Sequence, residues 1–237
     1  PQGTDFPPLV PPAIADELPL APVQAFSIDD ADTTEIDDAL SVQGLGSARV
    51  TVGIHIAAPG LAIRPGDALD TVGRARLSTV YMPGYKITMF PPEVVQAYAL
   101  SAGQAHSALS LYVTLDGSSL EILESSTRLE RVPVAANLRH EQLEGLLQDD
   151  SANAAQAEDT WRAPLEFLHR LAQHLKHGRE QVRGKPETHG RPDYSFRLLA
   201  HEENVPPSGA EQVRITQRQR GGPLDLIVSE LMVLANS

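Results

Sequence analysis

The stretch SIDDADTTEIDDALSV, residues 27–42, constrains the fold of this chain more than any other, because it places six carboxylates within ten residues, from Asp29 to Asp38. Two carboxylates at close range repel each other by about 1 kcal/mol even in water. Such a group is destabilising unless cations or solvent surround it. Residues 25–28 before it and the apolar segment after it have the composition of strands. The sequence therefore predicts two strands joined by an acidic loop.

The loop offers oxygen ligands only. Carboxylates without a histidine or cysteine among them suit magnesium, manganese or calcium rather than zinc. An EF-hand is the calcium-binding alternative, but frames that start at Asp30 or Asp32 lack the glycine at the sixth position and the glutamate at the twelfth. A solvated acidic loop without metal is the other alternative, and composition alone leaves it open.

The rest of the composition is that of a globular protein. The 237 residues are 41% apolar and 21% charged, which is enough to build a core. No apolar run of about 18 residues and no charged-then-apolar leader is present, so we expect a cytoplasmic protein without a membrane span. The absence of cysteine excludes disulfides, thiolate metal sites and a cysteine nucleophile.

The formal net charge of -12 argues against a simple nucleic-acid binder, because proteins that bind phosphates usually carry a basic stripe. Two explanations remain. Either the partner is not a polyanion, or cations held by the carboxylates meet the phosphates and basic residues act locally or from other domains.

Hydrophobic periodicity predicts strands and helices that are intermixed along the chain. In residues 48–57, Val50, Val52, Ile54 and Ile56 share one face of a strand, so His55 points to the other face, where we expect a hydrogen-bonded or exposed side chain. This order favours an α+β, or mixed α/β, domain. Strands are predicted over 25–28, 48–57, 107–115, 119–124 and 211–216, turns over 183–197, and helices from about residue 67, after the prolines at 91–92, and over 158–180 and 223–235.

Two further segments bear on domain organisation and partners. Residues 1–24 are predicted to be a linker or a wrapping arm, because the first 22 residues contain seven prolines. Residues 25–237 then form the folded domain. The polar face of the helix over 158–180 is rich in histidine, arginine and lysine, and this face is either solvated or turned toward RNA.

Several segments of the chain resemble, in order, the motifs of the ribonuclease II/R family and its RNB catalytic domain. The acidic loop with its flanking strands is similar to the family pattern in which a strand ending in xID leads to a loop that closes on DxDDA. Glu35 stands where the family usually has aspartate. The matching segments include FSIDDADTTEIDDALSV, VGIHIAAPGLAIRPGDALDTVGRARLSTVYMPGYKITMFPPEVV, HSALSLYVTLDG, RPDYSF and LDLIVSELMVLAN, and together they cover roughly residues 25–147 and 189–236.

The resemblance implies an RNB-type α+β fold with a twisted, mostly antiparallel or mixed sheet flanked by helices. It also implies a hydrolytic 3'-to-5' exoribonuclease that degrades single-stranded RNA to nucleoside 5'-monophosphates with Mg2+, for which Mn2+ can substitute. In the family, the domain continues past the segment similar to LAN to a catalytic arginine, and an S1-type OB domain commonly follows. We therefore expect the N-terminal portion of an RNB domain, acting on single-stranded RNA as a monomer.

By position in the family motif, the four carboxylates Asp29, Glu35, Asp37 and Asp38 are the implied catalytic and metal-binding residues. Asp29 and Asp38 are implied as direct metal ligands and Glu35 as support for a metal or a water. Asp37 is implied as the acid tied most closely to the chemistry. Because neighbours in an extended strand point to opposite faces, Asp37 and Asp38 need irregular backbone to serve one site.

The resemblance also implies contacts with RNA. Tyr81 falls where the family has a tyrosine against the last base, and Glu230 where it has a glutamate near the terminal ribose. Asn236 closes the family-like AN. His189 lies near the place of a base-stacking phenylalanine that has no clear counterpart here, and stacking by this histidine is the expected substitute. The alternatives are a half-buried turn aromatic for Tyr81, a helix-surface carboxylate for Glu230 and a helix-end cap for Asn236.

Four departures from the family pattern motivate other functions. Ala58, His106 and His140 replace a usual aspartate, arginine and tyrosine, and the extra methylene of Glu35 shifts a ligand by about an ångström, which can be costly to catalysis. A catalytically impaired RNB-like module that binds RNA or regulates is the first alternative, motivated by Glu35, Ala58 and the expectation that only part of the domain is present. A structural calcium-binding domain is the second.

Overall fold

A computed structural model describes residue 6 and residues 17–30, 33–143, 156–187, 193–199, 205–218 and 221–237. The chain divides into two compact units. The barrel unit comprises Asp16–Ala58, Tyr98–His189 and Gly221–Ser237, and the second unit comprises Pro1–Ala15, Pro59–Ala97 and Gly190–Arg220.

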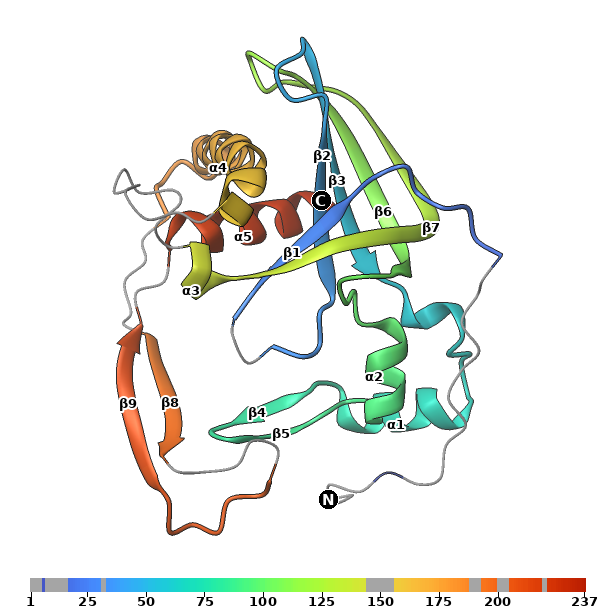
Figure 1. The fold of residues 1–237 in the computed structure, drawn as a ribbon, viewed down its shortest axis with the longest axis vertical. Coiled ribbons are helices and arrows are strands. Elements are labelled where there is room, and N and C mark those ends of the chain that lie inside the picture. The colour runs from blue at the N-terminus through green and yellow to red at the C-terminus, as the bar shows by residue number, and fades with distance from the viewer. Residues whose placement is uncertain are drawn as a thin grey trace. The chain divides into compact units, whose positions relative to one another are not determined.

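Five strands of the barrel unit form a closed barrel (Figure 1). Neighbouring strands pair antiparallel, except that the first and the last pair in parallel and so close the barrel. The predicted α+β class with a mixed sheet is confirmed, whereas the closure of the sheet was not predicted. The strands follow the order β1 (Ala25–Asp29), β2 (Asp38–Gln43), β3 (Arg49–Ala57), β6 (Ala105–Asp116) and β7 (Ile122–Arg139).

The strand β7 is much longer than the sequence predicted. It pairs with β6 from Ile122 to Pro133, and then with β1 from Val134 to Arg139. A register shift lies between Ala25 and Phe26, next to the point where the strand changes partner. The predicted turn at Asp116 is confirmed, because its carboxylate accepts hydrogen bonds from the backbone N–H groups of Ser118 and Ser119.

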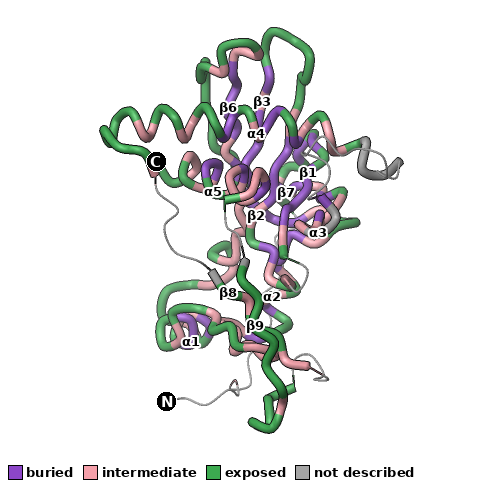
Figure 2. Tube along the Cα trace, turned by 90° about the vertical axis from the view of Figure 1, so that its left-hand side faces the viewer, coloured by how far each residue is buried: buried purple, intermediate pink, exposed green. Residues whose placement is uncertain are grey.

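Two helices cover one face of the barrel strands. The helix α4 (Gln156–Arg183) contributes Leu165, Leu168 and Leu171, and α5 (Pro223–Ala235) contributes Ile227 and Leu231, to one buried cluster with Phe26 and Ile54 of the strands. The predicted helix over 223–235 is confirmed to the residue. Figure 2 shows the buried positions gathered along the barrel strands and α5. Between β7 and α4 lies the short helix α3 (His140–Leu143).

The opposite face of the strands lines the barrel interior, where small residues surround His55. The two ring nitrogens of His55 share hydrogen bonds with the hydroxyls of Ser41 (2.9 Å) and Ser110 (2.8 Å). Burial lowers the pKa of His55 to about 4, so the imidazole is neutral. A Cβ at Gly53 would lie 2.7 Å from Nε2 of His55, so only glycine fits beside the ring. The predicted hydrogen-bonded histidine is confirmed.

The second unit is built from short elements. Its helix α1 (Ala68–Arg76) begins after Asp67, whose carboxylate accepts a hydrogen bond from the N–H of Asp70. This start agrees with the predicted helix from about residue 67. The remaining elements are η1 (Pro59–Leu61), the hairpin of β4 (Val80–Met82) and β5 (Tyr85–Ile87), the helix α2 (Pro92–Tyr98), whose last residue belongs to the barrel unit, and the hairpin of β8 (Asp193–Leu199) and β9 (Gln212–Arg218).

The prediction of turns over residues 183–197 is wrong for its last part. Residues from Asp193 onward form β8, which pairs antiparallel with β9. Tyr194, Phe196 and Leu198 alternate with polar residues as in a strand, but the neighbouring glycine and prolines suggested turns. A hairpin with one apolar face exposed leaves no clear burial signal in the sequence.

Part of the proline-rich segment packs against the barrel. The N–H of Arg131 donates to the carbonyl of Pro19, and the N–H of Ala21 donates to the carbonyl of Arg131. Ala21 and Val23 are buried in the interior cluster. Most of the predicted arm before this point lies outside the described residues. In the part of the chain that the structure describes, no helix is long and apolar enough to cross a membrane.

Candidate active site

The acidic loop leaves the barrel at the end of β1 and returns at the start of β2. Phe26 pairs with Leu40 in this antiparallel pair. Asp38 pairs with Ile56 of β3, and the N–H of Ala57 donates to the carbonyl of Asp37 at 2.8 Å. The barrel therefore fixes the backbone on both sides of the loop.

The structure brings the four predicted carboxylates into one electrostatic group. Burial, Asp29 and Asp37 together raise the pKa of Asp38 to about 6. Partial desolvation raises the pKa of Asp37, as do the charges of Glu35 and Asp29. Neighbouring carboxylates thus make ionisation of Asp37 and Asp38 less favourable.

Asp29 lies in a more balanced environment. Burial raises its pKa, while the hydrogen bond from Ser27 and the neighbouring Arg139 and His140 lower it. The hydroxyl of Ser27 donates to Oδ2 of Asp29 at 2.5 Å. The hydrogen bond from Ser27 therefore fixes the orientation of one carboxylate oxygen of Asp29.

Asp37 and Asp38 differ in exposure. Asp38 is the first residue of β2 and is half-buried, whereas Asp37, just before it, is exposed. The hydrogen bond from the N–H of Ala57 to the carbonyl of Asp37 continues the pairing of β2 with β3 by one residue. Alternation along an extended chain explains the difference, because neighbouring side chains point to opposite faces.

The group fits a hard divalent cation by its chemistry. Its ligands are carboxylate oxygens, and a cation would relieve the repulsion that raises the pKa values of Asp37 and Asp38. Among the described residues, no three histidine, aspartate or glutamate side chains already converge on one metal position. Glu35 is half-buried with Oε1 shielded from solvent, so metal binding requires side chains of the group to turn.

Tyr81 belongs to the second unit. It lies on β4 opposite Lys86 of β5, and 69% of its surface is exposed. It is therefore not the half-buried turn aromatic of the alternative interpretation. An exposed aromatic ring with a cation across the hairpin is suited to contact a nucleobase and its phosphate.

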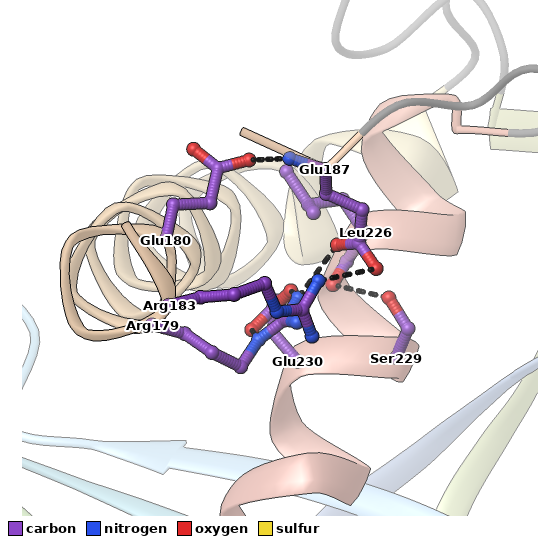
Figure 3. A network of polar contacts seen from close by, with 7 residues as sticks. All are labelled: Arg179, Glu180, Arg183, Glu187, Leu226, Ser229 and Glu230. Carbon is purple, nitrogen blue, oxygen red and sulfur yellow. Dashed lines mark hydrogen bonds and ion pairs between the residues drawn. The ribbon is translucent and has the colours of Figure 1, made fainter. Parts of the chain in front are cut away.

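Glu230 is committed to an ion pair between two helices. It lies on α5 and is only 3% exposed, and Nη2 and Nε of Arg179 on α4 donate to its two carboxylate oxygens at 2.5 and 3.3 Å (Figure 3). Nη2 of Arg179 also donates to Glu187 at 2.7 Å. In this arrangement Glu230 holds α4 against α5, and the predicted contact with ribose would need the pair to open.

The other two predicted RNA contacts differ in what the structure shows of them. Nδ2 of Asn236 donates to the carbonyl of Met232 at 2.7 Å, which is the helix-end cap considered as the alternative. His189 lies outside the described residues, as does Asp32 of the loop.

Sequence reasoning missed two groups of residues. Asn137 and Arg139, near the end of β7, contact the acidic loop and its supports. Tyr194 and Phe196 expose aromatic rings on one face of β8. Alternation in RPDYSF was the available signal for β8, whereas nothing in the sequence near residue 139 indicates a contact with residues about 110 positions earlier.

Comparison with known proteins identifies the family. The family model described as "RNB domain" matches residues 19–237. Exoribonuclease 2 from Proteus mirabilis is 29% identical over 231 residues, which cover 93% of this chain and 33% of that protein.

Solved structures show the same fold. An active-site mutant of the Dss1 exoribonuclease from Candida glabrata superposes with a TM-score of 0.78 at 23% identity, over 96% of this chain and 31% of that one. Mycoplasma genitalium RNase R in complex with ribose-methylated single-stranded RNA gives a TM-score of 0.73 at 15% identity, over 94% and 33% of the two chains. Yeast Ssd1, described as a pseudonuclease, gives 0.60 at 19% identity, over 90% and 24%. This chain thus spans about a third or less of the length of these proteins.

Proposed function

The chain belongs to the RNB domain family, and from this premise we propose that it forms the acidic part of an exoribonuclease active site. The finer proposal is a magnesium-dependent, hydrolytic, 3'-to-5' activity on single-stranded RNA that releases nucleoside 5'-monophosphates. The observation that carries it is the group of four carboxylates at the barrel end, in which burial and the charges of Asp29 and Asp37 raise the pKa of Asp38 to about 6. Such a group favours a divalent cation.

We assign the roles from exposure and charge. Asp29, Asp38 and Glu35 would hold the cation. A bound magnesium or manganese ion would activate a water and neutralise charge on the scissile phosphate. Asp37 remains exposed and has a raised pKa, so it is suited to take a proton from the attacking water.

We further propose that exposed aromatic rings of the second unit bind RNA. Tyr81 on β4 and the pair Tyr194 and Phe196 on β8 are each about half exposed or more. Stacking of a base on such a ring contributes roughly 1 to 3 kcal/mol and tolerates any sequence. Parts of the full-length protein beyond this chain would complete the RNA path and supply the arginine that the resemblance implies.

The test uses the full-length protein that carries this chain and single-stranded RNA labelled at its 3' end. We expect early release of labelled mononucleotide in the presence of magnesium and none with chelator. Asp37→Asn removes the proposed proton acceptor and should slow release by orders of magnitude. Asp30→Asn is the matched control, because its side chain is exposed in the same loop. Equal release by the wild type and Asp37→Asn would refute the proposal.

A catalytically impaired RNA-binding module is the second candidate. Glu35 in place of the usual aspartate and the lack of three converging ligands among the described residues favour it, and a pseudonuclease shares the fold. This candidate predicts that labelled RNA is bound but not shortened. The structural calcium-binding domain instead predicts that calcium, and not magnesium, raises the melting temperature.

A further inference from the structure

We propose that Asn137 and Arg139, which we call the β7 brace, are positioning residues that hold the acidic loop and Asp29 in place for a cation. The inference rests on the proposed function, which supplies the cation. It concerns two residues that belong to neither the carboxylate group nor the predicted RNA contacts. Both side chains come from the last three residues of β7, the strand that runs parallel to β1.

Arg139 holds the first part of the loop through its backbone. Its Nη1 donates to the carbonyl of Asp30 at 2.8 Å and to the carbonyl of Thr33 at 3.3 Å. The N–H of Thr33 also donates to the carbonyl of Asp30 at 3.1 Å, so the guanidinium closes a turn that is already formed. Both bonds of Nη1 go to carbonyl oxygens and occupy no carboxylate oxygen. The positive charge of the guanidinium therefore offsets negative charge in the loop and leaves the carboxylates available.

Asn137 orients Asp29 through a serine. Its Nδ2 donates to Oγ of Ser27 at 2.9 Å, and the hydroxyl of Ser27 donates to Oδ2 of Asp29. Since Oγ accepts from the amide, the hydroxyl hydrogen is directed toward the carboxylate. Asn137 therefore sets the direction of the bond that fixes one oxygen of Asp29.

The same amide supports the far end of the loop. Nδ2 of Asn137 donates to the carbonyl of Leu100 at 2.9 Å, and its Oδ1 accepts from the N–H of Ala102 at 2.8 Å. The N–H of Leu100 in turn donates to the carbonyl of Ile36 at 2.8 Å. One strand end thus restrains both ends of a loop whose charges repel one another, as residues around metal ligands do when they orient them.

Manganese binding to the full-length protein, measured by electron paramagnetic resonance of the free ion, separates positioning from simple charge. If Arg139 acted only as a positive charge near the site, Arg139→Gln would strengthen manganese binding, because it removes a repulsive charge. A positioning role predicts the reverse, with binding weakened by about 10-fold. Arg139→Lys should restore part of the affinity. Asn137→Ala changes no charge and should also weaken binding.

Hydrogen exchange gives a readout that needs no metal. In Arg139→Gln we expect the amide of Thr33 to exchange about 10-fold faster, because a hydrogen bond from a charged donor is lost, while the amide of Leu100 is unchanged. Arg49→Gln is the matched control. Arg49 begins β3, whose other end, Ala57, contacts the acidic loop, and it forms an exposed ion pair with Glu124. This variant should alter neither measurement.

The outcomes are distinct. Unchanged or stronger manganese binding in both Arg139→Gln and Asn137→Ala, with unchanged exchange at Thr33, would overturn the brace. If the wild type binds no manganese and degrades no RNA, the proposed function fails, yet faster exchange at Thr33 in Arg139→Gln would still support the placement of the loop by Arg139. If Arg139→Gln does not fold, Arg139→Lys and Asn137→Ala decide by the same two measurements.

Discussion

At the residue scale, Asp38 is a carboxylate whose ionisation destabilises the metal-free fold. Its pKa rises from 3.8 to about 6 through burial and the charges of Asp29 and Asp37. Because the folded protein binds this proton more tightly than the unfolded chain, the protonated side chain contributes to stability. This contribution is fully present below pH 3.8 and is lost as the pH rises through about 6. Near pH 7 without divalent cations, Asp38→Asn should raise the free energy of unfolding by about 1 to 2 kcal/mol.

Urea denaturation in chelator checks this expectation, and Asp116→Asn is its control of opposite sign. The carboxylate of Asp116 accepts hydrogen bonds from the N–H and hydroxyl of Ser118 and from the N–H of Ser119, and these hold its pKa below the ordinary range. Asn at position 116 should therefore lower the free energy of unfolding. If Asp38→Asn also lowered it, the carboxylate group would not be in electrostatic conflict.

His55 in the barrel interior gives a pH dependence of the opposite sign. Burial lowers its pKa from 6.5 to about 4, so the unfolded chain binds the proton more tightly than the folded protein. Its contribution to stability is therefore complete above pH 6.5 and is lost as the pH falls through about 4. The loss should amount to at most about 3 kcal/mol.

The two titrations overlap, so His55 is best measured in the Asp38→Asn background. There we expect the free energy of unfolding to fall steadily as the pH is lowered from about 6.5 to 4. His55→Gln should remove most of this slope, although it also alters the bonds to Ser41 and Ser110 and lowers stability overall. A slope that is the same with and without His55 would show that the imidazole is not the titrating group.

The site residues show what sequence can and cannot predict at this scale. The acidic stretch was recognised because its six carboxylates lie within ten residues, and the resemblance of this short segment to the family motif singled out four of them. Arg139 was missed because its partners Asp30 and Thr33 precede it by more than a hundred residues and meet it only when β7 pairs with β1. The ion pair of Glu230 was missed for the same reason, since Arg179 lies on another helix.

At the element scale, the pair between Arg179 and Glu230 should fasten α4 to α5. Glu230 is nearly inaccessible, while Arg179 keeps about a quarter of its side chain exposed. Breaking a buried pair from one side leaves a charge without its partner. Partial exposure and the second bond to Glu187 reduce this cost, so we expect Glu230→Gln to lower the free energy of unfolding by about 1 to 3 kcal/mol.

A double-mutant cycle with Arg179→Met measures the coupling by urea denaturation. The double variant should lose less stability than the two single losses added together, because each single variant leaves the other partner uncompensated. The exposed pair of Arg49 and Glu124 is the control, with an expected coupling below about 0.5 kcal/mol. Additive losses at Arg179 and Glu230 would mean that packing alone joins the two helices.

Elements with a buried face were predicted best. The strand over 48–57 and the helix over 223–235 match β3 and α5, because both bury one face and their apolar residues follow that face. The hairpin β4–β5 and the strand β8 were missed, since Val80 and Tyr194 expose about half of their surface and no burial pattern marks these strands. The strand predicted over 211–216 corresponds to β9, but its pairing with β8 was not predicted. Closure of the barrel depends on the distant pairing of β1 with β7, which no local pattern contains.

At the scale of the whole molecule, the net charge of -12 must be reconciled with the proposed RNA partner. Polyanion binding normally releases counterions from many basic contacts and weakens steeply with salt. We expect the full-length protein to bind RNA differently at the surface that this chain contributes, without many basic contacts. Its binding of single-stranded RNA should depend on a divalent cation held at the barrel end.

The double variant Asp29→Asn with Asp38→Asn separates the two modes of binding. It removes two negative charges, so contact by charge alone would become stronger, whereas contact through a held cation would become weaker. Fluorescence anisotropy with labelled RNA, in magnesium and in chelator, measures this. We expect the wild type to bind more tightly in magnesium and the double variant to show little difference between the two conditions. Stronger binding by the double variant in both would mean that the carboxylates only repel RNA, and that the acidic loop is not where the RNA end is bound.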